Sequence, residues 1–387
     1  MFLGIICLLL SATVAADALY YRHLRRKRSR GRRAFLICCI ATDALPLLTA
    51  LVGALSHDNT TAFMLFAMWM LWGWMVAVLP RMLFYLFSLS RLPRLGAAAG
   101  LCLAGTLVWG ATKGRTALLV NRIEIRSERL PAGFDGFRIV QLSDIHLGTV
   151  IRPERELQRI VDSVGALRPD LVVFTGDLVN IRSSELDGRA VRILGGLDAP
   201  CGVVSVTGNH DAGTYIKDTV AQPCAQSLAE VVRRQRAMGW RVLEDTTVYL
   251  RRNGDSISLS GLSFDPSLRH LRHDRNLPAA ALDAVYEGVP RSLYNVTAVH
   301  LPQLWEQIAA AGYGDLTLSG HVHGMQLKIR LFGRTFSPAQ WLYTRWSGAY
   351  EQAGRTLYIN DGTGCVAYPM RLGAYPEITL ITLKRCE

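Results

Sequence analysis

The 387-residue sequence has eight cysteines but no cysteine framework. Four of them fall in apolar segments near the N-terminus, and the other four are scattered at positions 201, 224, 365 and 386. No Cys-x-x-Cys spacing occurs, which excludes the usual structural zinc sites and dithiol redox pairs. A disulfide among the last four cysteines would suit an oxidising compartment, but the sequence indicates no particular pairing.

Charge is scarce in the first 112 residues outside two short basic stretches. Four apolar segments lie there: Phe2–Tyr20, Ala34–Leu55, Ala62–Leu79 and Leu95–Thr112. Each is close to the ~20 residues that cross ~30 Å of hydrocarbon. No basic residues precede the first segment, which favours a retained helix over a cleaved signal peptide. The sequence therefore predicts a bundle of four transmembrane helices over 1–112, followed by a second domain over 113–387.

The basic residues predict how these helices cross the membrane. Residues 22–33 contain eight Lys and Arg and are expected in the cytoplasm, whereas loop 56–61 contains none and is expected outside. The third helix is expected to end at Pro80-Arg81, followed by an amphipathic stretch over Arg81–Arg94 at the inner interface. The fourth helix then leads outward. The second domain is thus predicted on the extracytoplasmic, periplasmic side of a multi-pass protein of the inner membrane.

Most of the basic excess belongs to this membrane region. The first 113 residues hold 12 Lys and Arg against three Asp and Glu, whereas the remainder holds 31 against 28. A nucleic-acid partner is not expected, because no basic cluster marks the second domain. The run at 22–33 is interpreted as a topology determinant, with binding of anionic lipid head groups as the alternative.

Two acidic residues in the apolar segments require an explanation. Asp43 is costly in lipid, and we interpret it as a polar contact between helices rather than as part of a transport path. Asp17 is expected beside Arg22 at the inner end of the first helix. A transport role is also disfavoured because the segments show no evident intramembrane polar pairs.

Short β-branched runs separated by Gly, Pro and Asp begin near Leu118. Strands are predicted at 120–125, 137–142, 171–175, 202–207, 240–243, 247–250, 256–259, 295–299, 315–318, 357–360 and 378–383. Helices are predicted at 153–167, 189–194, 226–238 and 304–311. Strands interleaved with helices predict an α/β domain with two packed sheets flanked by helices.

Five polar motifs follow apolar runs of this domain. They are Asp144-Ile145-His146, Gly176-Asp177, Gly208-Asn209-His210-Asp211, His300 and Gly320-His321-Val322-His323. Each alone has an ordinary interpretation as a turn or a satisfied core histidine, but together they place three Asp, one Asn and five His at strand ends. Such a set can hold two ions about 3.5–4 Å apart around a carboxylate. The mixed ligands favour Mn, Fe, Zn, Co or Ni over Ca or Mg.

The same motifs resemble the calcineurin-like metallophosphoesterase superfamily across about 113–387. The lead-in at 134–139 and the tail at 376–378 are similar to its membrane-attached bacterial branch. Val322 and Met325 depart from that branch, which often has Thr and Gly there; neither is a ligand position. The resemblance implies a calcineurin-like two-sheet β-sandwich that binds two divalent metal ions.

The resemblance also implies a role for each motif residue. Asp144, His146 and His323 would bind the first metal, and Asn209, His300 and His321 would bind the second. Asp177 would bridge them. His210 would donate a hydrogen bond or proton to the phosphate or leaving group, held by Asp211. A hydroxide bridging the metals would attack phosphorus in line.

The expected function is hydrolysis of a phosphate mono- or diester, possibly lipid-linked, by a phosphodiesterase for which manganese is a candidate metal. Besides this substrate, the expected partners are membrane lipids. One alternative is a nucleotide-lipid pyrophosphate hydrolase of envelope lipid synthesis, which would favour a cytoplasmic site. The non-enzymatic alternative is a membrane scaffold with an inactive metal-binding domain, which is disfavoured because no ligand is missing. The sequence carries no signal for oligomeric state.

Overall fold

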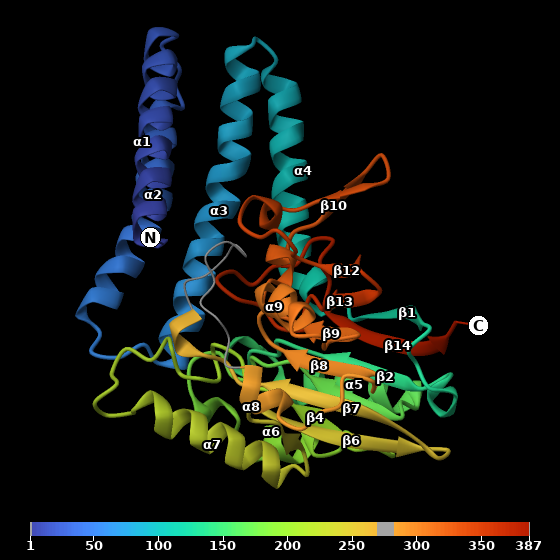
Figure 1. Ribbon diagram of the computed structural model, residues 1–387. Helices are drawn as coiled ribbons and strands as arrows, with labels where there is room; N and C mark the ends of the chain where they lie inside the picture. The colour runs from blue at the N-terminus through green and yellow to red at the C-terminus, as the bar shows by residue number, and fades with distance from the viewer. Residues whose placement is uncertain (1, 269–281, 387) are drawn as a thin grey trace. The chain divides into compact units, whose positions relative to one another are not determined.

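A computed structural model of the chain describes residues 2–268 and 282–386. The chain divides into two compact units (Figure 1). The first contains Met1–Lys113 and Val366–Met370, and the second contains Gly114–Cys365 and Arg371–Glu387. All eight cysteines are free thiols in the described part of the chain.

Unit 1 consists mainly of four helices: α1 (Phe2–Arg26), α2 (Arg32–Leu55), α3 (Thr61–Leu89) and α4 (Pro93–Thr112). Three segments, Arg32–Leu55, Thr61–Leu89 and Pro93–Thr116, are long and apolar enough to cross a membrane. The prediction of apolar membrane helices is therefore confirmed for α2, α3 and α4. A fourth span, formed by α1, stays a prediction.

The expected end of the third helix was wrong, because α3 continues through Pro80 to Leu89. A proline removes one backbone donor, and a neighbouring helix can support the chain there. In α4, a Cβ atom on Gly100 would lie 3.0 Å from the carbonyl oxygen of Pro80, and Gly96 packs on the next turn of α3. Small residues four apart allow this close approach of two helices. Arg81 consequently lies inside a helix and does not begin an interfacial stretch.

Arg81 joins three helices of unit 1 through ion pairs. Its Nη2 atom lies 2.8 Å from Oδ1 of Asp43 on α2 and 2.9 Å from Oδ2 of Asp17 on α1. Tyr85 donates a hydrogen bond of 2.7 Å to Oδ1 of Asp17. The predicted interhelical contact of Asp43 is confirmed. Asp17 precedes Arg22 by five residues on α1, and its ion pair is with Arg81. The premise that these segments lack polar pairs was wrong.

Unit 2 contains two six-stranded sheets and a separate hairpin. The first sheet has the order β1-β14-β2-β3-β4-β5, built from Leu119–Ser127, Glu377–Arg385, Arg138–Leu142, Leu171–Phe174, Val203–Ser205 and Arg241–Val242. The second has the order β12-β13-β9-β8-β7-β6, built from Gly348–Gln352, Arg355–Ile359, Leu316–Ser319, Asn295–Val299, Asp255–Leu262 and Thr246–Arg252. The hairpin pairs β10 (Ile329–Leu331) with β11 (Arg334–Phe336).

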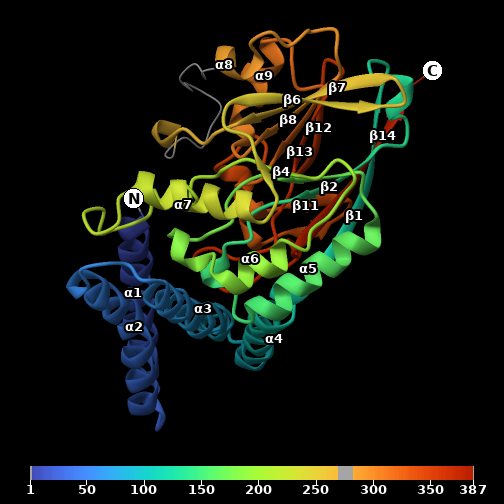
Figure 2. The same cartoon turned by 90° about the horizontal axis from the view of Figure 1, so that it is seen from below.

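Among the described residues, the α-helices that flank the sheets are α5 (Pro153–Leu167), α6 (Gly188–Leu194), α7 (Cys224–Ala237), α8 (Leu282–Tyr286) and α9 (Trp305–Ala310). Figure 2 shows α5, α6 and α7 on one side of the sheets and α8 and α9 on the other.

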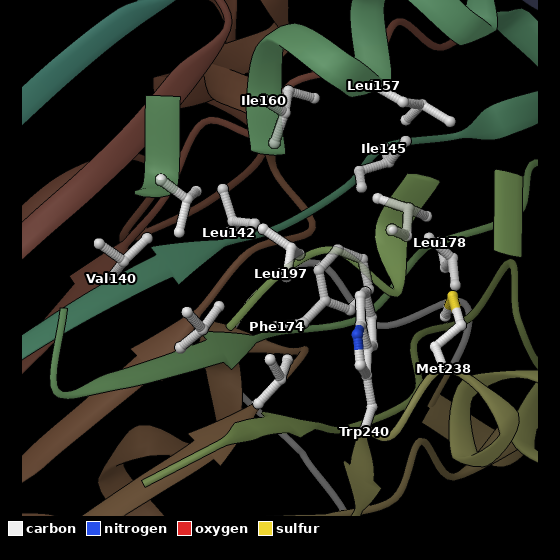
Figure 3. Close-up of a cluster of buried hydrophobic side chains, with 14 of the residues drawn as sticks. Val140, Leu142, Ile145, Leu157, Ile160, Phe174, Leu178, Leu197, Met238 and Trp240 are labelled. Atoms are coloured by element: carbon white, nitrogen blue, oxygen red, sulfur yellow. The ribbon is translucent and has the colours of Figure 1, made fainter. Parts of the chain in front are cut away.

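Alternating side chains of β3 explain this layering. Val172 and Phe174 belong to the core between the first sheet and α5–α7 (Figure 3), whereas Leu171 and Val173 belong to the core between the two sheets. A strand that is apolar on both faces must be covered on both. The predicted α/β fold of packed sheets and helices is confirmed. The elements β10, β11, β12 and α8 had no counterpart in the sequence prediction.

Strand direction determines where the polar motifs lie. Strands β2, β3 and β4 are parallel neighbours in one sheet, and β8 and β9 are parallel neighbours in the other. Each of the five motifs follows the carboxyl end of one of these strands. Parallel neighbours end at the same edge of a sheet, so the fold gathers the motifs.

Candidate metal centre

The backbone of the motif loops is in an unusual conformation. Asp144, His146, Asp177, His321 and His323 have φ angles of 53°, 48°, 60°, 74° and 56°, in the left-handed region that favours glycine. Such a residue costs about 1–3 kcal/mol and persists only where its surroundings enforce it. The N–H of Asp144 donates to the carbonyl of Gly176, at 2.9 Å, and the N–H of His146 donates to the carbonyl of Asp177, at 3.2 Å.

Gly176 allows the loops after β3, β4 and β8 to approach one another. Its φ is 95°, and a Cβ atom there would lie 2.8 Å from both the N atom of Gly208 and Nδ1 of His300. Any side chain at this position would push apart the backbone that carries Asp177 and the ring of His300.

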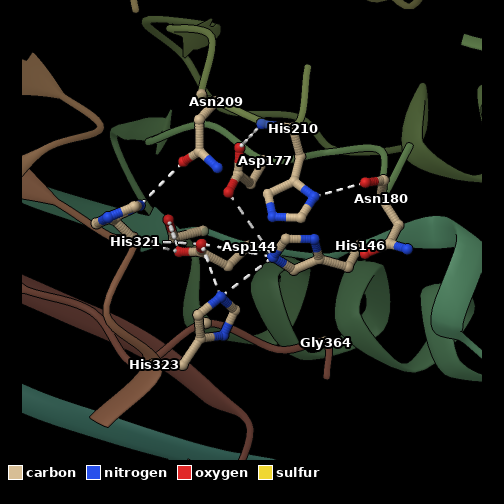
Figure 4. A network of polar contacts seen from close by, with 12 residues as sticks. Asp144, His146, Asp177, Asn180, Asn209, His210, His321, His323 and Gly364 are labelled. Atoms are coloured by element: carbon tan, nitrogen blue, oxygen red, sulfur yellow. Dashed lines mark hydrogen bonds and ion pairs between the residues drawn. The ribbon is translucent and has the colours of Figure 1, made fainter. Parts of the chain in front are cut away.

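Asp144, His146 and His323 form the first group of convergent side chains (Figure 4). Nε2 of His146 lies 3.1 Å from Nε2 of His323, and the latter lies 3.1 Å from Oδ1 of Asp144. Oδ1 of Asp144 also lies 3.7 Å from Nε2 of His146. All three residues are buried.

The second group contains Asp177, His300 and His321, with Asn209 beside them. Oδ1 of Asn209 lies 3.0 Å from Nε2 of His300 and 2.9 Å from Nδ1 of His321. Oδ2 of Asp177 lies 3.0 Å from Nε2 of His300. The Nδ1 atom of His300 lies 2.8 Å from the carbonyl oxygen of Thr175, which leaves Nε2 facing the group.

Asp177 lies between the two groups. Its Oδ2 atom is 3.8 Å from Nε2 of His146 in the first group, in addition to its 3.0 Å contact with His300 in the second. Its other oxygen accepts the N–H of His210 at 2.8 Å. The seven residues predicted as ligands are thus brought together, and the Asp177 carboxylate lies within reach of both groups.

The chemistry of these atoms fits divalent cations. Neutral imidazole nitrogens and carboxylate oxygens are electron-pair donors, and buried donors that face one another at about 3 Å are stabilised by a cation between them. Burial lowers the pKa of His146 to about 4 and that of His321 to about 3, so both rings are neutral at pH 7. Neutral rings are the form that binds metal.

The carboxylates of the centre are ionised and affect one histidine strongly. Burial opposes ionisation of Asp144 and Asp177, but the neighbouring imidazoles hold the pKa of each carboxyl below its usual value. Burial likewise opposes a charge on His300, yet the Asp177 carboxylate raises the pKa of that ring to about 9. Without a cation, His300 therefore carries a proton at neutral pH.

His210 points into the centre, but its partner is not the predicted one. Its ring lies 4.5 Å from the ring of His146, measured between centroids, and its Nδ1 atom lies 2.5 Å from the carbonyl oxygen of Asn180. Because a carbonyl only accepts, Nδ1 carries the proton and Nε2 is directed elsewhere. The expectation that Asp211 holds the His210 ring was therefore wrong.

Asp211 instead fixes the loop that carries Asp177. Its carboxylate is fully buried and accepts four backbone N–H groups, from Asp177, Leu178, Val179 and Gly208, at 2.8–3.1 Å. Its position next to His210 in the sequence suggested a paired role, but the side chain turns toward the backbone of the loop after β3.

Two further residues touch the centre and were missed in the sequence. Arg371 is fully buried, donates to the carbonyls of Gly364, Ala374 and Asp361, and places Nη2 3.2 Å from Nδ1 of His323. It lies outside every motif, so no signal pointed to it. Tyr215 accepts a hydrogen bond of 3.1 Å from Nδ2 of Asn209, and its ring lies 4.3 Å from that of His210. It is the first aromatic residue after the Gly-Asn-His-Asp motif, which is a weak signal.

The names of known proteins with similar sequences agree with a metal centre at this position. The calcineurin-like phosphoesterase family matches residues 137–325. The uncharacterized metallophosphoesterase YkuE of Bacillus subtilis is 32% identical over 317 residues, which cover 77% of this chain and 98% of that protein. The chain belongs to this family. It is accordingly a metallophosphoesterase, a hydrolase of phosphoester bonds that uses divalent metal ions.

Two other relatives of the metallophosphoesterase are named for membranes or lipids. A transmembrane protein with metallophosphoesterase domain from Danio rerio is 30% identical over 292 residues, covering 72% of this chain and 60% of that protein. The UDP-2,3-diacylglucosamine pyrophosphatase LpxG of Chlamydia muridarum is 25% identical over 310 residues, covering 67% of this chain and 87% of that protein. With the apolar helices of unit 1, these likenesses indicate a membrane-associated enzyme.

Proposed function

We propose that this protein is a binuclear phosphoesterase of the inner membrane that hydrolyses a phosphate ester, with lipid-linked diesters as the leading class. The observation that carries the proposal is the position of Asp177, whose Oδ2 atom lies 3.0 Å from His300 and 3.8 Å from His146. A carboxylate within reach of two ligand groups suits a bridge between two ions. The first ion would have Asp144, His146 and His323, and the second Asn209, His300 and His321.

When bound, such ions would supply Lewis-acid stabilisation of the phosphoryl oxygens and would lower the pKa of a water toward ~7. The residues of the chain then have distinct tasks. Asp211 keeps Asp177 in place through the backbone of its loop. The carbonyl of Thr175 fixes the ring of His300 by accepting a hydrogen bond from Nδ1, which leaves Nε2 free to bind an ion.

His210 is proposed as the donor to the phosphate or leaving group. Burial lowers the pKa of its ring in the free protein, and its Nδ1 proton is held by Asn180. A bound phosphate brings negative charge beside the ring and favours the doubly protonated form. Nε2 would then donate a hydrogen bond or a proton as the ester bond breaks.

The primary test uses the purified full chain in nanodiscs, titrated with Mn²⁺ and supplied with bis(p-nitrophenyl) phosphate. We expect two ions bound per chain and turnover that requires both. Asp177→Asn should abolish turnover and reduce the bound metal, because an amide is a poor bridge between two cations. One bound ion at full activity, or an active Asp177→Asn variant, would reject the binuclear proposal.

We also propose that α1 forms a fourth span and that the catalytic unit faces the periplasm. The support is the positive-inside rule: residues 22–33 carry eight Lys and Arg, and the loop after α2 carries none. Fusions of alkaline phosphatase and of green fluorescent protein to the C-terminus test the orientation. We expect the alkaline phosphatase fusion to be active and the green fluorescent protein fusion to be non-fluorescent. An inactive phosphatase with a fluorescent second fusion would place the site in the cytoplasm.

A second candidate is hydrolysis of the pyrophosphate bond of a nucleotide-linked lipid. Its support is the likeness to the Chlamydia protein named as a UDP-2,3-diacylglucosamine pyrophosphatase. This candidate would favour a cytoplasmic site. Release of UMP from UDP-2,3-diacylglucosamine, together with a cytoplasmic C-terminal fusion, would favour it over the leading proposal.

A further inference from the structure

The hairpin formed by β10 and β11 is exposed along its whole length. All residues from Ile329 to Phe336 are exposed, although both strands are rich in apolar side chains. In Figure 1 the hairpin stands away from the two sheets of unit 2. An isolated two-stranded hairpin is only marginally stable in water. Its exposed apolar side chains pack against neither sheet, so the core of the domain does not explain them.

Pairing places the apolar residues of the hairpin on one face and at its tip. Ile329 is opposite Phe336, and Leu331 lies two residues further along the same strand and thus on the same face. Phe332 forms the turn with Gly333 and is completely exposed. Trp341, in the turn that follows the hairpin, is 73% exposed. Exposed apolar groups of this size usually mark a binding surface.

The charges of the same segment indicate which partner it fits. From Lys328 to Ser347 the sequence contains four basic residues, among them Arg330 and Arg334 on the hairpin, and no acidic residue. Aromatic side chains accompanied by Lys and Arg are typical of the interface of an anionic bilayer. The described part of the chain carries three helices fit to cross a membrane, so a bilayer is a partner already available to this chain.

The base of the hairpin is fixed directly beside a predicted metal ligand. Ser337 donates a hydrogen bond of 2.8 Å to the carbonyl of Gly324, the residue that follows His323. On the other side, the N–H of Lys328 donates to the carbonyl of Leu372 at 2.7 Å, and the Lys328 side chain pairs with Asp361. The position of the hairpin and that of the His323 loop are therefore linked by short, partly buried contacts.

We propose that the β10–β11 hairpin and Trp341 insert into the interface of the lipid bilayer, with Phe332 at the deepest point. Insertion holds the side of the metal centre that carries His323 near the lipid head groups. Phosphoesters that remain anchored in the bilayer are then within reach of the centre. This last step rests on the proposed function, whereas insertion itself does not.

The insertion is tested by measuring depth in the intact protein. A ketone-bearing phenylalanine analogue replaces Phe332 and is coupled to a nitroxide, which leaves the eight cysteines unlabelled. The full chain is placed in nanodiscs that contain anionic lipid. Power-saturation EPR then compares relaxation by oxygen, which partitions into lipid, with relaxation by a nickel chelate, which stays in water. The control label replaces Val220, which is 93% exposed on a loop of the same unit.

We expect a nitroxide at 332 to be relaxed by oxygen and protected from nickel, and a nitroxide at 220 to show the opposite. Equal access of nickel to both positions would overturn the proposal. Spin–spin broadening at 332 that grows with the number of chains per disc would overturn it too, because the partner would then be a second copy of the chain.

Kinetic measurements on a soluble and on a lipid substrate distinguish an effect on membrane insertion from an effect on catalysis. Phe332→Asp should leave hydrolysis of bis(p-nitrophenyl) phosphate unchanged and should raise the KM for a p-nitrophenyl phosphodiester of diacylglycerol in nanodiscs about tenfold, since the tip loses its apolar anchor. The matched control Val220→Asp should change neither. An unchanged KM for Phe332→Asp would contradict the link to lipid substrates, whereas absence of all turnover in the parent protein would count against the proposed function and leave the EPR result intact.

Discussion

The hydroxyl oxygen of Tyr215 lies 3.1 Å from Nδ2 of Asn209, and this contact decides which way the asparagine amide faces. With Nδ2 donating to the phenol, Oδ1 is directed to the rings of His300 and His321. An amide oxygen can bind a cation, but an amide nitrogen cannot. Tyr215 is therefore a positioning residue for the second predicted ion.

We expect Tyr215→Phe to weaken binding of the second ion about fivefold, the effect of losing one hydrogen bond of ~1 kcal/mol. The first ion should bind as before. Isothermal titration of the metal-free protein with Mn²⁺ measures both steps. Tyr249→Phe is a suitable control, because Tyr249 is exposed to a similar extent (46% against 44%) on β6. Equal weakening of both steps, or of neither, would contradict this role.

His210→Ala should lower kcat by about 10²–10⁴-fold, because it removes the donor to the phosphate or leaving group. Metal content should remain near that of the parent protein, since His210 is not among the proposed ligands. Elemental analysis and steady-state kinetics of the same preparation check both statements. Loss of both ions would show instead that His210 supports the centre itself.

Asp211→Asn should act on stability rather than on proton transfer. An asparagine amide presents one oxygen, so about two of the four backbone N–H groups that Asp211 accepts would lose their partner, at a cost of about 2–4 kcal/mol. We expect a lower melting temperature and a loss of bound metal as the Asp177 loop loosens. A variant with the parent melting temperature and a changed pH profile would restore the catalytic role predicted from the sequence.

Affinity for the ion at the His300 group should rise with pH from about 6 to 9. In the metal-free protein the Asp177 carboxylate raises the pKa of His300 to about 9, so below that pH binding must expel a proton. Each proton released makes the affinity increase by up to tenfold per pH unit, and the increase ends above the pKa. Titration calorimetry in buffers of different ionisation enthalpy counts the protons. No proton release at pH 7 would contradict this pKa.

Arg81→Leu should destabilise unit 1 strongly, because Asp17 and Asp43 would remain buried without a positive partner. Removal of one side of a buried ion pair costs about 3–5 kcal/mol. Thermal unfolding in detergent should show the loss, with Arg91→Leu as a control because Arg91 is exposed beyond the end of α3. An additional Asp43→Asn change should recover part of the loss.

The sequence was most informative where the chain obeys local rules. A strand that is buried on both faces, such as β3, is apolar throughout. The Gly, Asp or His that follows such an apolar run therefore identified the end of the strand. It was least informative where contacts with residues far away in the sequence determine the structure. Arg81 looked like the end of a helix beside Pro80, but α4 packs against α3 at this point and Arg81 pairs with Asp17 and Asp43. The hairpin at 329–336 has no buried face, so its apolar residues follow no core pattern.

The left-handed backbone at five residues affects which substitutions are expected in relatives that lose activity. These residues are Asp144, His146, Asp177, His321 and His323. Glycine adopts this conformation without the penalty that other residues incur. A descendant that exchanged one of these residues for glycine would lose a ligand while relaxing its backbone. Inactive relatives are therefore expected to accumulate glycine at these five positions first, and they can be recognised in sequence collections by that substitution pattern.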